Sequence, residues 1–167
     1  MEKRGPDDRY SQRLNDIGAP QESGVAVFQP RSLNSEPLAN ADMHYCRVIV
    51  QYAATAPGEA YHSWETERLD DESRASLLEA VNDNLDYTQR LLAPPTFDWI
   101  DIDGTKALRV KYRRTGNNGN TTACAMYYLF NYDEMAIVTT AYREQESALW
   151  QSDMENTLRT FRWRSRK

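Results

Sequence analysis

The sequence has few of the residues on which catalytic and metal sites are usually built. It contains two histidines and two cysteines among 167 residues. Two cysteines exclude a disulfide-dense secreted fold and leave few soft ligands for a metal. No run reaches the ~18 consecutive apolar residues of a membrane-spanning helix. The most apolar segment, HYCRVIVQYAA, is interrupted by Arg47 and Gln51.

Composition and charge indicate a soluble globular chain with one domain. Hydrophobic residues make up 40% and charged residues 27% of the sequence, with a net charge of −5. This charge argues against a general nucleic-acid or anionic-membrane partner, although a local basic patch can still exist. Residues 1–23 are polar and predict a mobile N-terminal arm, and residues 24–167 a single domain. The start, MEKRGPDDRYSQR, lacks the apolar core of an export signal. We therefore expect either a periplasmic or cell-envelope protein whose signal is absent from this sequence, or a cytoplasmic one.

In two early segments apolar and polar residues alternate with the period of β-strands, and one helix follows. GVAVFQP, residues 24–30, predicts a strand that ends at its proline, and MHYCRVIVQY, residues 43–52, predicts a second strand. Residues 70–92 change to helical spacing and are followed by two prolines. The sequence therefore predicts strands, then a helix.

A sharp hairpin is predicted at Asp103-Gly104, because a tight turn needs positive φ at its centre. If these two residues form the turn, facing residues have numbers that sum to 207. Trp99 would then face Leu108, and Asp98 would face Arg109. The later segment TGNNGN is followed by a strand pattern rather than by the Lys-Ser or Lys-Thr and helix of a phosphate loop. We interpret it as a second turn.

Residues 97–143 therefore predict a four-strand antiparallel meander. A closing helix follows, with Trp150, Met154, Leu158 and Phe161 at intervals of four and three. Strands joined by tight turns and flanked by helices predict an α+β fold: an antiparallel sheet covered by helices.

Five segments together give the chain a family resemblance. They are GVAVFQP, SLLEAVNDNL, DIDGTKALRVKYRR, YYLFNYDEMAIVTTAY and LRTFRW. In these patterns, across residues 24–163, the chain resembles the PsbP-like or Mog-like superfamily of α/β/α sandwich domains, which includes many small bacterial envelope proteins. The resemblance implies a binding role, because members serve as assembly factors, GTPase partners or accessory proteins. It implies no shared catalytic residues, so it assigns no site residue to this chain.

One possible reactive site involves His44 and Cys46, which lie two positions apart on one predicted strand. They could form a nucleophile pair or two metal ligands, with Cys124 as a third group across the sheet. Two buried free thiols are the simpler interpretation, and a disulfide between them is the alternative in an oxidising compartment.

Basic clusters at residues 109–114 and 159–167 are interleaved with aromatic residues, as in single-stranded nucleic-acid binders. Arg109, Lys111 and Arg113 would share one strand face and are candidates for contact with a partner. The favoured function is a non-enzymatic binding, accessory or assembly module with an unidentified protein partner and no cofactor or metal. The alternatives are a small thiol- or metal-dependent enzyme using His44 and Cys46, and a nucleic-acid-binding domain.

Overall fold

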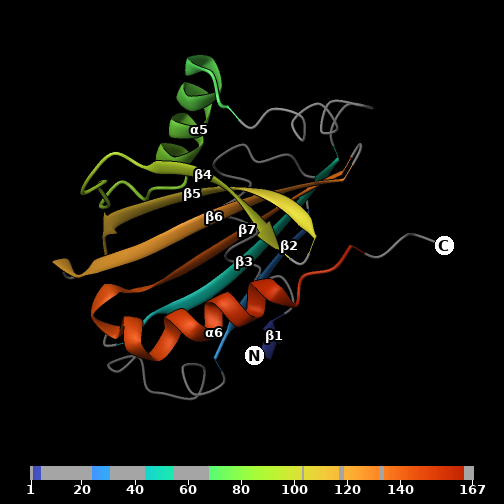
Figure 1. The fold of residues 1–167 in the computed structure, drawn as a ribbon. Coiled ribbons are helices and arrows are strands. Elements are labelled where there is room, and N and C mark those ends of the chain that lie inside the picture. Colours follow the sequence, from blue (N-terminus) through green and yellow to red (C-terminus); the bar gives the residue numbers. More distant parts are fainter. Residues whose placement is uncertain are drawn as a thin grey trace.

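The computed structural model describes residues 2–4, 24–30, 44–54, 68–102, 104–116, 119–131 and 134–163. These residues form a seven-stranded sheet in the order β1-β2-β3-β7-β6-β5-β4, with every neighbouring pair antiparallel (Figure 1). The fold is therefore α+β, as the sequence predicts. The chain crosses from β3 to the far edge at β4 and returns strand by strand until β7 pairs with β3.

The first three strands of the chain lie next to one another at one edge of the sheet. They are β1 (Glu2–Arg4), β2 (Gly24–Gln29) and β3 (Cys46–Ala54). The prediction that residues 1–23 contain no element differs from the structure at β1, which pairs with β2. Backbone hydrogen bonding to a free sheet edge needs no apolar side-chain pattern, so a sequence scan has no signal for it. The rest of the predicted arm lies outside the described residues.

Helix α5 spans Asp71–Asp83. Asp70 caps its N-terminus, and the Asp70 side chain accepts a hydrogen bond from the Ser73 N–H at 2.8 Å. The helix is shorter than the predicted range of 70–92. It ends at the run Asn82-Asp83-Asn84, because these residues compete for backbone hydrogen bonds and are poor helix formers. Leu91, predicted to lie in the helix, instead makes an isolated β-bridge to Arg114.

The strands β4 (Thr96–Ile102), β5 (Thr105–Thr115), β6 (Thr121–Asn131) and β7 (Glu134–Arg143) pair in chain order. The predicted register is confirmed, because Trp99 faces Leu108 and Asp98 faces Arg109. Gly104 has φ +81°, as the turn prediction requires. The segment after Gly119 is strand β6, which confirms a hairpin connection rather than a phosphate loop.

The chain then forms the short 3-10 helix η2 (Glu144–Glu146) and helix α6 (Ser147–Arg159). Figure 1 shows α6 lying along the sheet, well separated from α5. The predicted stripe is confirmed: Met154 and Leu158 are buried, and Trp150 and Phe161 pack against the same core cluster.

The two helices cover opposite faces of the sheet. The α6 side includes Cys46, Val48, Tyr127, Leu129 and Val138. The α5 side includes Val81, Leu108, Val110, Cys124 and Met126. Since Cys46 and Cys124 lie on opposite faces, both remain free thiols, and the disulfide alternative is wrong. None of the described helices is long and apolar enough to cross a membrane.

Candidate functional site

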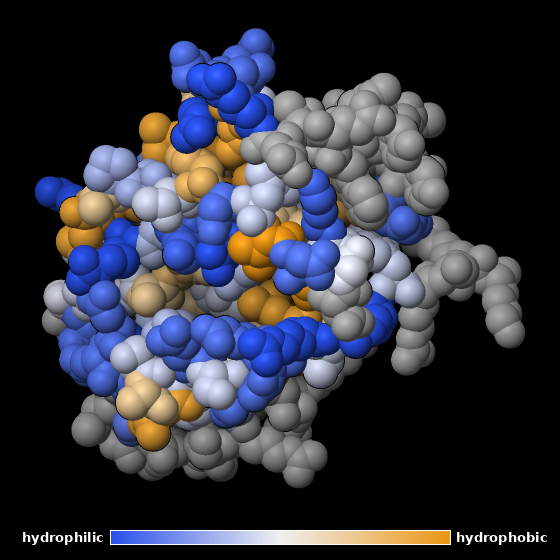
Figure 2. Space-filling model, viewed as in Figure 1, coloured by the Kyte–Doolittle hydropathy of each residue, from blue (hydrophilic) through white to orange (hydrophobic). Residues whose placement is uncertain are grey.

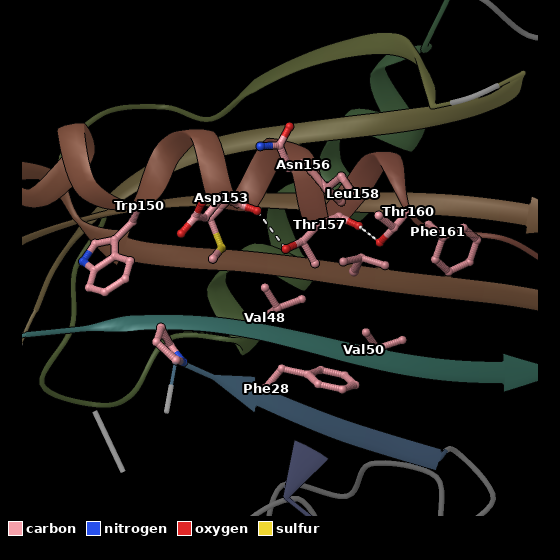
Figure 3. A pocket seen from close by; sticks show the side chains of 13 residues that line it. Phe28, Val48, Val50, Trp150, Asp153, Asn156, Thr157, Leu158, Thr160 and Phe161 are labelled. Carbon is pink, nitrogen blue, oxygen red and sulfur yellow. Dashed lines mark hydrogen bonds between the residues drawn. The ribbon is translucent and has the colours of Figure 1, made fainter. Parts of the chain in front are cut away.

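An open groove runs between α6 and the strands beneath it (Figure 3). Its volume is about 810 Å³, and most of its lining is apolar. The strands contribute Phe28 from β2 and Val48 and Val50 from β3, while Trp150 and Phe161 stand at the two ends of the α6 side. Phe28 faces Val48 across the two strands, so the sheet register itself places these side chains on one floor.

The polar lining residues come from α6 and its end. They are Asp153, Asn156, Thr157 and Thr160. The hydroxyl of Thr157 donates to the carbonyl of Asp153 at 2.7 Å, and that of Thr160 to the carbonyl of Thr157 at 2.7 Å (Figure 3). These donors are therefore directed into the helix backbone, and the groove presents mainly hydrocarbon.

The groove wall is held by Glu146, a carboxylate that is only 8% exposed. It accepts a hydrogen bond from the Trp150 indole N–H at 2.9 Å and from the Tyr45 backbone N–H at 3.4 Å, and it contacts His44 Nδ1. These contacts join the start of α6 to the residues that precede β3. They fix the Trp150 ring, which forms one end of the groove.

The three residues predicted to contact a partner, Arg109, Lys111 and Arg113, lie on the α6 side of β5. A second cavity of about 430 Å³ lies beside them. Arg109 makes a two-pronged ion pair with Asp98, with Nε–Oδ1 at 2.9 Å. This contact lowers the pKa of Asp98. Arg113 pairs with Glu144 at 2.5 Å, and Lys111 is exposed. Two of the three predicted residues thus already have carboxylate partners, which leaves little uncompensated charge for nucleic acid.

The second basic cluster lies only partly within the described residues, because 164–167 are outside them. Arg159 is exposed at the end of α6, and Arg162 donates to the carbonyls of Arg159 and Phe161 at 2.7 and 2.6 Å. This cluster is at the far end of α6 from Glu144 and Arg113. The described residues therefore form no single basic stripe.

The candidate thiol site does not assemble. His44 contacts Glu146, whereas Cys46 is 1% exposed and Cys124 lies on the other face. Burial, with the nearby carboxylates of Asp153 and Glu146, raises the pKa of Cys46 to about 12. A thiol in this state is a poor nucleophile at neutral pH. The described residues contain no group of three or more His, Cys, Asp or Glu side chains placed to hold a metal ion.

Comparison with known proteins gives a likeness of fold. No family model matches the chain, and no curated protein does. The chain is similar in structure to a crystallised protein of unknown function from Pseudomonas aeruginosa, a suspected regulator, with a TM-score of 0.56 and 13% sequence identity. The match covers 89% of this chain and 88% of the other. At this identity the likeness concerns the fold alone.

The groove itself was not predicted from the sequence. The apolar stripe predicted which face of α6 packs on the sheet, but a stripe of this kind usually packs completely. Figure 2 shows a mostly hydrophilic surface with hydrophobic residues gathered between the C-terminal part of α6 and the end of β4. This patch is on the β4 side of α6 (Figure 2) and is distinct from the groove, whose strand residues come from β2, β3 and β7.

Proposed function

We propose that the protein is a non-enzymatic binding module that holds an apolar segment of a partner protein in the groove between α6 and strands β2 and β3. The observation that carries the proposal is the open apolar groove of about 810 Å³ with an aromatic residue at each end, Trp150 and Phe161 (Figure 3). Large aromatic side chains supply much of the affinity in protein interfaces.

The chemistry of the groove supports binding rather than catalysis. Among the described residues that line the groove, only Asp153 is ionisable, and burial raises the pKa of the nearby Cys46 thiol. General acid–base or nucleophilic work needs an activated group with a positioned partner. The thiol-enzyme and nucleic-acid alternatives gain no support from the contacts described above.

The proposal extends to the fold family. The helices on opposite faces of the sheet support an α/β/α sandwich of the PsbP-like or Mog-like kind. An accessory or assembly role, with the partner in the bacterial envelope, is the function we infer from that resemblance.

Site-specific cross-linking in the native cell tests the proposal. A photoreactive amino acid at Asn156, on the groove rim, should give a protein adduct, whereas one at Tyr87 should not. Tyr87 is a suitable control because it is 97% exposed and follows α5, away from the groove. Val50→Asp places a charge on the groove floor and should abolish the adduct from position 156 while the circular dichroism spectrum is kept. Equal adducts from both positions, or an adduct that persists in Val50→Asp, would contradict the proposal.

A further inference from the structure

Three arginines gather at one end of the sheet face opposite the groove. Arg114 of β5 faces Thr122, which faces Arg143 of β7, so these side chains form one row across the sheet. Arg47 of β3 faces Ala141, two residues before Arg143, and therefore lies on the same face. We call Arg47, Arg114 and Arg143 the arginine cluster. Arg114 and Arg143 are 9% and 6% exposed.

Tyr45 lies between two members of this cluster. The Arg47 guanidinium carbon is 5.2 Å from the Tyr45 ring centroid, and that of Arg114 is 5.8 Å from it. One aromatic ring thus attracts two cations. A ring quadrupole supplies a weak attraction but no negative charge, so it leaves the mutual repulsion of the two cations without a counter-charge from the described residues.

Arg114 has unusually weak partners for a buried cation. Its Nη1 contacts the Thr115 carbonyl at 3.3 Å, and its Nη2 contacts the Tyr45 hydroxyl at 3.4 Å. The Cys124 thiol also interacts with the Arg114 side chain. All three groups are neutral, and the two oxygen contacts are long. None of the described carboxylates forms an ion pair with Arg114 or Arg47. The more exposed Arg109 and Arg113 each have one.

Burying a guanidinium without a counter-charge is costly, so such groups are normally paired. The chain has 25 acidic and 20 basic residues, yet the described part of it supplies no carboxylate to Arg114. A guanidinium has five N–H donors in a planar fork that matches the oxygens of a carboxylate or phosphate. Its open hydrogen-bonding capacity is therefore suited to an oxyanion.

We propose that the arginine cluster binds a small-molecule oxyanion, through a carboxylate or phosphate group that pairs with Arg114 and Arg47. The Tyr45 hydroxyl supplies a further hydrogen bond beside them. This site is on the α5 side of the sheet, so it is separate from the groove and does not depend on the function proposed for it.

Thermal unfolding at constant ionic strength tests this site. The buffer anion is chloride, inorganic phosphate or citrate, and the proteins are the wild type, Arg114→Gln and Arg159→Gln. Arg159 is an exposed arginine on α6 and serves as the control for general charge effects. Because a ligand that binds only the native state stabilises it by mass action, phosphate or citrate should raise the melting temperature with concentration. The rise should occur in the wild type and Arg159→Gln and be lost in Arg114→Gln. The more effective anion identifies the ligand group.

Two results would overturn the proposal. One is a melting temperature that is the same in chloride, phosphate and citrate. The other is an equal anion-dependent rise in Arg114→Gln, which would indicate an adventitious ion only. If Arg114→Gln fails to fold, Arg47→Gln replaces it, because Arg47 is only half-buried. Its response to the effective anion should be at least several-fold weaker than that of the wild type, and an unchanged response would equally overturn the proposal.

Discussion

Replacing Glu146 with alanine should lower the free energy of unfolding by about 2–4 kcal/mol. The carboxylate is 8% exposed and accepts from the Trp150 indole at 2.9 Å and the Tyr45 N–H at 3.4 Å. Each buried donor left without an acceptor costs about 1–3 kcal/mol. The longer contact, from the Tyr45 N–H, should cost an amount at the lower end of that range. Loss of the His44 contact adds to the total loss of stability.

Urea unfolding followed by tryptophan fluorescence measures this loss, and Glu144→Ala is the matched control. Glu144 lies on the same short helix, but its ion pair with Arg113 is about half exposed, so its removal should cost no more than about 1 kcal/mol. Glu146→Gln keeps an acceptor and most of the side-chain volume and should lie between the two. Equal losses for the two alanine variants would refute the view that Glu146 holds the groove wall.

Three further predictions concern the turn, the thiols and an ion pair. Gly104→Ala should cost about 1 kcal/mol because φ is +81°, whereas Gly24→Ala, in an extended strand with open space around it, should be nearly neutral; similar stabilities for both variants would refute the turn assignment. Cys46 and Cys124 should resist a disulfide reagent at pH 8 until urea unfolds the chain, since burial raises the pKa of both thiols; labelling in the native state would contradict this. For Asp98, hydrogen bonding to its arginine partner lowers the pKa below 3.8, so the stabilisation is present at neutral pH and is lost as the pH falls through that lowered value. Wild type and Asp98→Asn should differ by less than about 1 kcal/mol at pH 7 and converge toward pH 2, and a gap that widens in acid would show the sign to be wrong.

The strand register was predictable because two local rules agree. The Asp103-Gly104 turn fixes which residues face each other, and alternation assigns each side chain to a face. A shift of one residue would have exchanged the apolar and charged faces of β5. The structure accordingly has every pair from Thr96 with Lys111 to Ile102 with Thr105 as expected.

The helix end and the groove were less predictable, each for its own reason. Leucine spacing continues past Asn84, but backbone competition from the short polar side chains ends α5 before the prolines. The groove depends on how α6 lies relative to β2 and β3, which are more than 90 residues earlier in the chain. Local periodicity gives the apolar face of a helix but not the fraction of that face that its neighbours leave open.

The run Lys111-Tyr112-Arg113-Arg114 shows how one short segment can serve both faces of a sheet. Alternation places Lys111 and Arg113 on the α6 side, where Arg113 has an acidic partner. It places Arg114 on the α5 side, buried and close to Tyr45. A basic run in the sequence is therefore not one basic surface in the fold. Because the two sites face away from each other, a charge placed on the groove floor should leave the anion response unchanged, and loss of Arg114 should leave groove cross-linking unchanged.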